Sequence, residues 1–526
     1  MAAPLADTAE TLFARYGPRY RWLVTVFGLI GSFAMVLSAT IANVAVPNVM
    51  GTFGVGQDQA QWLATAFLTT MTVSQLLNHW MTQALGARTA YTITIIVFLI
   101  GTAVGWFAPN IDIVILARVL QGFSAGIIAP MVMVVMFQVF PPDRRGLAMG
   151  IYGSGVVLAP ALGPVVGGMA IDNFDWRFIF LMPVPFCVVA LAGGLLFMPA
   201  GRPSGPCPRF DWLGYLLLGS ALAMLMTGAA NGVRKGWDSN EIVMLLGGGA
   251  TFAFLFVLRQ LHSANPLLDF SLWRNRRFVA ALMVGLVFGA GNFASSYAVP
   301  VFVQTVQGLS ATEAGLMLMP AGLLLVLVLP ITGRFADALP HHVPVYIGLI
   351  CFAAGIVLMS SADVNTPFWT FAVFVCVSRC GLAFIIPSLN VGALSTLHPS
   401  ELTRGSGSVN FIRQLGGAVG TNLIVVWLQL RASFHHDGLM ATQTASNETS
   451  QELLTSVTDS FRDAGMPAGI SDSLALDYLS NIVQAQALTL GFKDSFLALA
   501  VVFVAALIPT WVFSRAKAAA NNPTTL

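Results

Sequence analysis

Long apolar runs separated by short polar breaks dominate this chain. Fourteen such runs are about twenty residues long, which is the length that an α-helix needs to cross the hydrocarbon core of a bilayer. Transmembrane β-strands would instead give runs of about ten residues with alternating polarity. We therefore predict membrane-spanning helices at residues 22–46, 59–81, 89–108, 112–139, 146–170, 177–199, 211–231, 241–259, 278–304, 312–333, 343–362, 367–394, 407–430 and 492–514.

The composition supports the lipid bilayer as the solvent of this chain. Hydrophobic residues make up 56% of the 526 residues and charged residues only 9%, whereas a soluble domain has about 25% charged residues. Backbone polar groups inside a bilayer must be satisfied within helices or a closed barrel. The predicted fold class is all-α and integral to the membrane. The net charge of +2 gives no reason to expect a nucleic-acid partner.

Arginine and lysine residues are distributed unequally between the two sides of the predicted spans. With a cytoplasmic N-terminus, sixteen of them fall in cytoplasmic segments, six on the opposite side and three inside spans. Cytoplasmic loops are the ones enriched in these residues. Both termini are therefore predicted to be cytoplasmic. The first apolar run, preceded by Arg15, Arg19 and Arg21, is predicted to stay as a signal anchor.

Weak internal repeats divide the spans into two halves. HWMTQALGAR (79–88) follows the second span and GRFADALPHH (333–342) follows the tenth, while GIIAP (126–130) in the fourth span resembles AFIIP (383–387) in the twelfth. Such repeats mark transporters built from two bundles that rock about a central site. The predicted parts are a cytoplasmic segment (1–21), an N-terminal six-helix bundle (22–199), two inserted helices with linkers (200–277), a C-terminal six-helix bundle (278–514) that contains a long periplasmic loop (431–490), and a cytoplasmic tail (515–526).

The sequence has no motif for chemical catalysis. It contains no HExxH, no serine–histidine–aspartate arrangement and no P-loop, so neither an enzyme nor an ATP-driven pump is predicted. Cys376 and Cys380 are four residues apart, but no second pair or histidine is nearby, and we interpret them as packing residues. We expect no cofactor and no bound metal.

Polar side chains inside the predicted spans are the candidates for a transport site. Arg118 and Gln121 lie one turn apart in the fourth span, Arg379 lies in the twelfth and Arg413 in the thirteenth. A charge at such depth is costly unless it faces a cavity or a partner. An arginine here could instead bond backbone carbonyls in a structural role. The predicted substrate cavity is lined by Asn43, Gln75, Arg118, Gln121, Asn292, Tyr297, Arg379, Asn390, Asn410 and Arg413.

Small residues and prolines are unusually dense in the fifth span, which reads GSGVVLAPALGPVVGG (153–168). Small residues let helix backbones approach closely, and prolines bend a helix. Tight packing is the first interpretation of this segment. A tight seam between the two halves would also suit a gate that must open without leaking. The residues assigned to it are Gly155, Pro160, Gly163, Pro164, Gly167 and Gly168.

This segment resembles the antiporter signature in drug exporters of the major facilitator superfamily. Motifs similar to those of its fourteen-span drug:proton antiporter branch, typified by EmrB-like inner-membrane subunits, occur in order: TIANVAVP (40–47), ARVLQG (117–122), PPDRRGLAMG (141–150), NPLLDFSLWRNRRF (265–278), VPVFVQTVQGLSATEAGLMLMPAG (299–322) and GRFAD (333–337). The resemblance implies the major facilitator fold, in which two six-helix bundles accompany two inserted helices. It also implies exchange of small amphiphilic substrates for protons, and a multi-pass location in the bacterial inner membrane.

The same resemblance assigns roles to two further segments. Gly333, Arg334 and Asp337 are expected to form a conformational-switch loop. Residues 431–490 are similar to a loop that is expected to lie beside a periplasmic adaptor (a membrane fusion protein), which connects to an outer-membrane channel. This loop contains a possible amphipathic stretch at 473–488. The alternative interpretation is a disordered connector.

The sequence departs from the family where a proton carrier is expected. Ser38 occupies the place of an aspartate that many members have in the first span, and Gln83 and Ala84 stand where charged residues are common. No aspartate or glutamate lies in the middle of a predicted span; Glu313, Asp112 and His79 are weak substitutes. A cavity with arginines and no carboxylate would attract an anionic or neutral amphiphile. This is a hypothesis about the substrate.

Together these observations predict secondary efflux of lipophilic compounds by alternating access. Two alternatives stay open. One is a dedicated exporter of a single metabolite or siderophore, and the other is a transporter-like scaffold or sensor that moves nothing. Ser38 favours the scaffold, while the intact motifs of the fourth, fifth and thirteenth spans argue against it.

Overall fold

The computed structural model describes residues 8–55, 62–200, 210–263, 266–309, 311–444 and 446–515. These residues form helices and no strands, which confirms the all-α fold class. Twelve helical segments among them are long and apolar enough to cross a membrane. The other two predicted spans fall on α5 with α6 and on α9, so the count of fourteen stays a prediction.

The helices follow the predicted spans in order. Those of the first half are α1 (Ala9–Tyr16), α2 (Arg19–Val44), α3 (Val46–Phe53), α5 (Trp62–Ser74), α6 (Leu77–Leu85), α7 (Ala87–Trp106), α8 (Ile111–Val139), α9 (Arg145–Asn173), α10 (Phe178–Leu181) and α11 (Val184–Phe197). The inserted pair is α12 (Trp212–Lys235) and α13 (Asn240–His262). The second half has α14 (Arg276–Thr305), α15 (Ala311–Ala338), α16 (His342–Ser360), α17 (Phe368–Leu394), α18 (Leu402–Met440), α19 (Glu448–Asp463), α20 (Ala468–Ala505) and α21 (Leu507–Arg515).

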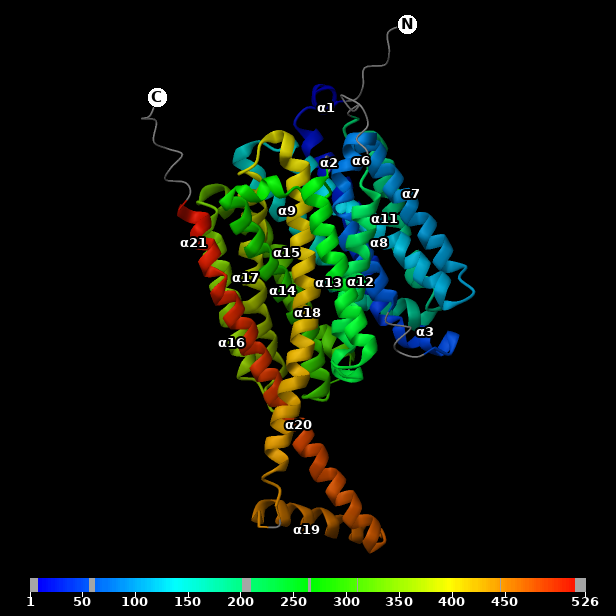
Figure 1. The fold of residues 1–526 in the computed structure, drawn as a ribbon, viewed down its shortest axis with the longest axis vertical. Helices are drawn as coiled ribbons and strands as arrows, with labels where there is room; N and C mark the ends of the chain where they lie inside the picture. The colour runs from blue at the N-terminus through cyan, green and yellow to red at the C-terminus, as the bar shows by residue number, and fades with distance from the viewer. Residues whose placement is uncertain are drawn as a thin grey trace.

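The helix bundle has two distinct ends (Figure 1). α1 and the last turn of α21 lie at one end, which we call the α1 end. α19 projects from the other, which we call the α19 end. An even number of crossings would place both ends of the chain on one side, as the sequence predicts.

Two predicted spans are interrupted by turns. The second span is divided at Gln75 and Leu76, where the Leu76 amide bonds the Val73 carbonyl three residues back in place of an α-helical bond. The sixth span is divided between α10 and α11, and Pro183 forms the N-cap of α11. Proline has no amide hydrogen and suits the start of a helix rather than its interior.

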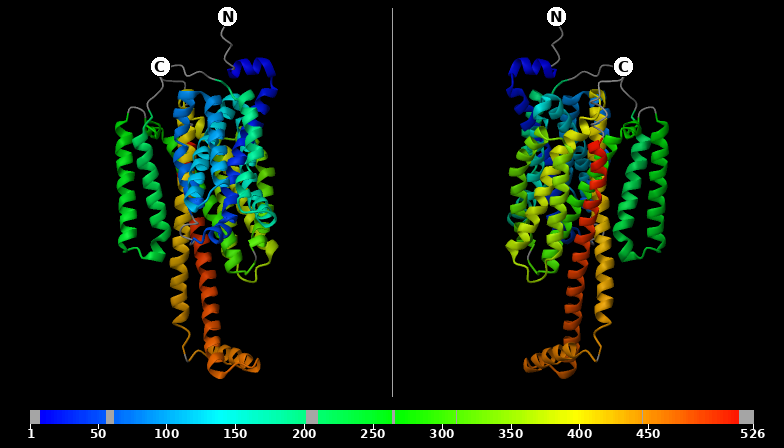
Figure 2. Two further views of the ribbon diagram at one scale, coloured as in Figure 1. Left: turned by 90° about the vertical axis from the view of Figure 1, so that its right-hand side faces the viewer. Right: turned by 90° about the vertical axis from the view of Figure 1, so that its left-hand side faces the viewer.

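The segment 431–490 differs most from its prediction as a polar loop. α18 continues without a break to Met440, and α20 begins at Ala468 and runs into the last span. The two helices extend beyond the bundle and carry α19 between them (Figures 1 and 2). Arg431 of α18 and Asp494 of α20 form an ion pair of 2.7 Å near the base of this projection. The segment is therefore a helical hairpin, which we call the stalk.

The helices α12 and α13 form a pair beside the rest of the bundle (Figure 2). α13 packs chiefly on α12, and α12 in turn contacts α5 of the first half and α18 of the second. Its buried Leu218 and Leu222 share a hydrophobic cluster with Val73 and with residues of α14. The inserted pair therefore covers a line along which the two halves meet.

Candidate functional site: polar groups and the seam between the halves

The two halves meet at the α1 end through α9 and α15. A Cβ atom on Gly333 would overlap the carbonyl oxygen of Gly146, and one on Gly146 would overlap that of Gly333. Only glycine permits this approach of two backbones. One turn further along, a Cβ atom on Gly150 would overlap the Leu329 carbonyl oxygen. The seam is therefore tight for at least two turns.

Asp337 completes this contact with its carboxylate. Its Oδ1 and Oδ2 accept hydrogen bonds from the amides of Gly146 (2.6 Å) and Leu147 (2.9 Å) at the start of α9. First-turn amides of a helix lack intrahelical partners, and the helix dipole favours a negative charge there. Gly333 and Asp337 thus take part in one interhelix contact, whereas the side chain of Arg334 is exposed. All three residues lie within α15 rather than in a loop, and their role as a conformational switch stays a prediction.

Three of the glycines assigned to the seam in the fifth span pack closely against a helix of their own half, which agrees with tight packing; their role in a gate stays a prediction. Gly155 faces Leu29, Gly163 faces Thr40, and Gly167 faces Ile41, all on α2 of the same half. The seam uses the preceding turns of α9 instead. A sequence rich in small residues indicates that a helix packs closely against another, but it does not indicate which helix is the partner.

Arg118 is fully buried inside the first half. Its Nε donates to the Leu63 carbonyl of α5 (2.9 Å), and a terminal nitrogen donates to Ser38 Oγ of α2 (3.1 Å) and to Gln121 Oε1 (2.8 Å). Gln121 in turn donates to Thr102 Oγ1 of α7 (3.0 Å). This network joins four helices of one half, so its contacts favour the structural interpretation of Arg118.

Arg379 lies on α17 of the second half and is also buried, at 7% exposed against 1% for Arg118. It donates to Asn292 Oδ1 and to Ser296 Oγ of α14, each at 3.1 Å. The side chains of Ser296 and of its neighbour Tyr297 are exposed. A guanidinium bonded only to neutral groups beside exposed positions suits the binding of an anion.

Arg413 lies between the halves. It bonds Asn410 Oδ1 one turn earlier on α18, and Asn410 donates to the sulfur of Met133 on α8 (3.4 Å). Tyr152 of α9 interacts electrostatically with Arg413. Because α8 and α9 belong to the first half and α18 to the second, this group lies where a central site is expected.

The remaining predicted site residues differ in burial. Gln75 and Asn390 are buried, and Gln75 Oε1 and Asn390 Nδ2 have no hydrogen-bond partner in the described part of the chain. Pro160 is exposed. The surroundings of Asn43, Pro164 and Gly168 lie outside what the structure describes. Among the described candidates the hydrogen bonds fall into three groups, one around each arginine, and a shared cavity stays a prediction.

None of the three intramembrane arginines forms an ion pair with a residue that the structure describes. Sequence reasoning did not single out two partners of these arginines, Ser296 and Tyr152. Serine and tyrosine are common inside membrane helices, so only the contact itself identifies them.

A bundle of membrane-length helices in two halves, with buried polar groups between them, defines a membrane transporter. The sequence matches the Major Facilitator Superfamily over residues 28–421, and the chain belongs to this family. Its members are transporters rather than enzymes.

Relatives of known sequence and structure agree with this assignment. The multidrug export protein EmrB of Haemophilus influenzae is 29% identical, with 93% of this chain and 95% of EmrB covered. The fatty acid resistance protein FarB of Neisseria gonorrhoeae is 26% identical, with 94% and 96% covered. The human organic anion transporter MFSD10 shares the fold, with a TM-score of 0.60 at 13% identity over 94% of this chain and 99% of MFSD10. Multidrug efflux proteins are thus among the homologues.

Proposed function

We propose that this protein exports lipophilic and amphiphilic compounds, anionic ones among them, by alternating access and in exchange for protons. The observation that carries the proposal is Arg379, whose guanidinium bonds the neutral Asn292 and Ser296 beside exposed positions of α14. An anionic head group would supply the charge that these partners lack. The names of EmrB and FarB, a multidrug exporter and a fatty acid resistance protein, support the same substrate class.

The proposed location is the bacterial inner membrane, with the α1 end in the cytoplasm. The unequal distribution of arginine and lysine supports this orientation. Because α9 and α15 are in close contact at the α1 end, the structure then corresponds to a state closed toward the cytoplasm. The stalk would project into the periplasm. Its exposed Leu476, Tyr478 and Ile482 suit contact with a periplasmic adaptor that leads to an outer-membrane channel.

The proposed proton route does not use the first span. Ser38 is bonded to Arg118, so the first-span position that carries an aspartate in many family members holds no titrating group here. A weak-acid substrate that brings its own carboxyl group would provide one. The protein should then transport weak acids but not permanently charged cations.

Transport into inside-out vesicles tests the proposal. The vesicles are given a neutral, fluorescent lipophilic dye and a labelled medium-chain fatty acid. A pH gradient is imposed, and an ionophore then collapses it. We expect uptake of both to stop when the gradient collapses. Uptake that persists without the gradient would contradict proton exchange, and export of quaternary cations but not of weak acids would contradict the anionic class.

Matched variants of Arg379 assign the substrate site. Arg379→Gln should reduce fatty acid transport about tenfold or more, because a charge-assisted hydrogen bond contributes about 1.5–3 kcal/mol. Transport of the neutral dye should change little. Arg379→Lys should retain part of the fatty acid transport, since it keeps the charge. Equal loss of both substrates in Arg379→Gln would indicate a structural role instead.

A further inference from the structure

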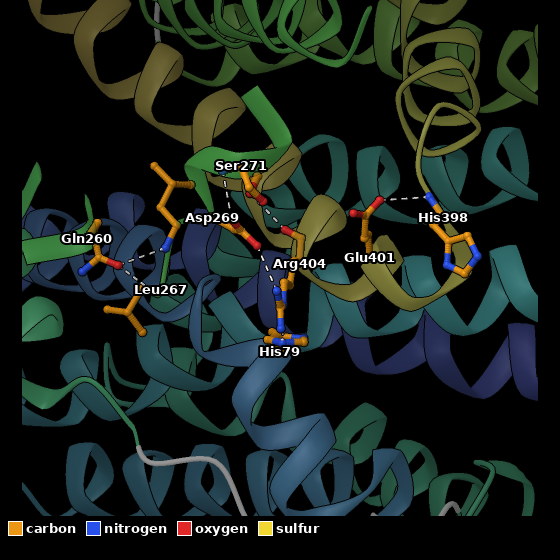
Figure 3. Close-up of polar contacts among 10 residues, drawn as sticks. His79, Gln260, Leu267, Asp269, Ser271, His398, Glu401 and Arg404 are labelled. Atoms are coloured by element: carbon orange, nitrogen blue, oxygen red, sulfur yellow. Dashed lines mark hydrogen bonds and ion pairs between the residues drawn. The ribbon is translucent and has the colours of Figure 1, made fainter. Parts of the chain in front are cut away.

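A second polar contact joins the two halves at the α1 end (Figure 3). His79 belongs to α6 of the first half, and Arg404 belongs to α18 of the second. Arg404 Nε donates to His79 Nε2 at 2.8 Å, and Arg404 Nη1 donates to Asp269 Oδ2 at 2.9 Å. Asp269 belongs to neither half, because it lies in the linker that follows the inserted pair. One guanidinium thus binds both the first half and the insertion.

The geometry fixes the protonation of His79. Its Nε2 can accept from Arg404 only in a neutral imidazole with the proton on Nδ1. A protonated imidazole would place a second cation against the guanidinium. Asp269 is the acidic group beside the pair, and its side chain is 11% exposed whereas that of Arg404 is 42% exposed. The ion pair is therefore only partly screened by solvent.

The linker around Asp269 is held firmly. Asp269 Oδ1 accepts from the Ser271 amide at 3.0 Å. Burial of this carboxyl raises its pKa, but the hydrogen bonds from Ser271 and the contact with Arg404 outweigh burial and hold the pKa below its usual range. Asp269 is therefore a carboxylate at neutral pH. Leu268 and Leu272, on either side of it, are buried in the hydrophobic cluster that contains Val73 and Leu76 of the first half.

Polar contacts also tie the linker to the inserted helices. Gln260, near the end of α13, accepts from the Leu267 amide at 2.6 Å through Oε1 (Figure 3). Its Nε2 donates to Asp211 at the start of α12 at 3.0 Å. Arg259 also pairs with Asp211, at 3.1 Å. The ends of both inserted helices and the linker therefore form one connected unit.

The inserted pair contacts the first half independently of Arg404. The hydroxyl of Tyr215 on α12 bonds Ser74 Oγ of α5 at 3.2 Å, and the ring of Phe210 lies 5.2 Å from that of Trp80 on α6. The insertion therefore contacts the first half through these aromatic residues and the second half through the Asp269–Arg404 pair. It bridges the seam at the α1 end.

We propose that the inserted helix pair and its linker act as a clamp that holds the α1 end closed, through Asp269, Arg404 and His79. Opening this end separates α6 from α18 and must break the Arg404–His79 bond. Asp269 positions Arg404 for that bond and keeps its charge compensated. The clamp gives the two inserted helices a role in the conformational cycle, and it holds whatever the transported substrate is.

Distance measurements between spin labels at Thr89 and Ser395 test the clamp. Both positions are exposed and lie at the α1 end, Thr89 in the first half and Ser395 in the second. The five native cysteines are first replaced. In Asp269→Asn, the ratio of open to closed populations should rise about three- to tenfold, because one charge-assisted contact is weakened. Asparagine can still accept from the Ser271 amide, so the linker should keep its local fold.

Matched variants separate the clamp from a general weakening of the inserted pair. Glu241→Gln removes the carboxylate of the Lys235–Glu241 ion pair at the far end of the same two helices, and it should leave the distance unchanged. His79→Leu should open the α1 end, whereas His79→Gln should keep it closed because its amide oxygen still accepts from Arg404.

The clamp would be overturned by an unchanged distance in Asp269→Asn, or by an equal change in Glu241→Gln. Equal opening in His79→Gln and His79→Leu would also count against it. The readout does not require transport. A protein that exports nothing but shows these distances would overturn the proposed function and support the clamp.

Discussion

Two of the contacts that join the halves at the α1 end differ in construction, although the internal repeat relates them. In the first, α15 meets α9 with glycine against glycine, and Asp337 accepts from the amides of Gly146 and Leu147. In the second, α6 meets α18 with His79 against Arg404, and the carboxylate comes from Asp269 in the linker.

Aligning the repeats explains the difference. HWMTQ (79–83) corresponds to GRFAD (333–337), so His79 takes the place of Gly333 and Gln83 that of Asp337. The imidazole of His79 prevents the close approach that Gly333 permits, and Gln83 cannot supply a charge. The second contact therefore obtains its acid from another segment. The lesson is that an incomplete motif can be completed in space by residues far away in sequence.

Of the substitutions considered, Gly333→Ala should weaken a contact between the halves the most. The added Cβ would overlap the Gly146 carbonyl oxygen, which belongs to rigid backbone. Overpacking of this kind costs about 1–3 kcal/mol, so the α9–α15 contact should separate. Spin labels at Arg144 and Leu339, both exposed at the α1 end, should report a longer distance.

Gly315→Ala is the control for this substitution. Gly315 lies on the same helix, and a Cβ atom there would meet open space. Its distance distribution and melting temperature should match those of the parent protein. A similar separation in both variants would mean that the effect does not depend on the contact with Gly146, and the tight seam would lose its special role.

Asp337→Asn should have the next largest effect. Asparagine has one acceptor oxygen and no charge, so one of the two α9 amides loses its partner and the dipole interaction is lost. The expected cost is about 1–2 kcal/mol, which is roughly a tenfold shift toward the open state in the same label pair. Asp363→Asn, which removes a carboxylate that caps an exposed turn at the other end of α16, should change nothing.

The sequence could predict most of the fold because membrane spans leave a simple record. Apolar runs gave the helices, and the repeat indicated two halves. Regions where helices continue beyond the apolar run were missed, because α18 and α20 carry polar residues such as His435 and Asp477 outside the bundle. The hydrophobic pattern marks the membrane boundary rather than the end of the helix.

The candidate site was less predictable from the sequence. Arg118, Arg379 and Arg413 stood out because charge is rare in apolar spans. Which of them is enclosed by its own half depends on neighbours such as Leu63 and Ser296, which carry no sequence signal of their own. Asp269 falls in a linker, within the motif NPLLDFSLWRNRRF (265–278), and the sequence indicates no partner for it. Its function depends on a contact with a residue 135 positions away.

Gln83→Asp tests whether the two contacts can be made alike. In the Asp269→Asn background, an aspartate at position 83 would restore an acid at the place that corresponds to Asp337. Partial recovery of the closed population, by about two- to threefold, is expected because an exposed carboxylate four residues after His79 on the same face of α6 would attract Arg404. Gln83→Asn in the same background should recover nothing. Equal recovery in both variants would show that charge is not the missing element.

Acidification should change the closed population the least. Its effect on the parent protein, compared with Asp269→Asn, reports the contribution of the Asp269 carboxylate. The pKa of this carboxyl is held below its ordinary value of 3.8, so its stabilising contribution is complete at neutral pH and is lost as the pH falls through the lowered pKa. The difference in closed population between the parent protein and Asp269→Asn should therefore stay constant from about pH 8 to pH 5 and shrink only in stronger acid. A difference that vanished near pH 6 would place the titration on another group and would mean that the second contact, unlike the first, responds to pH in the physiological range.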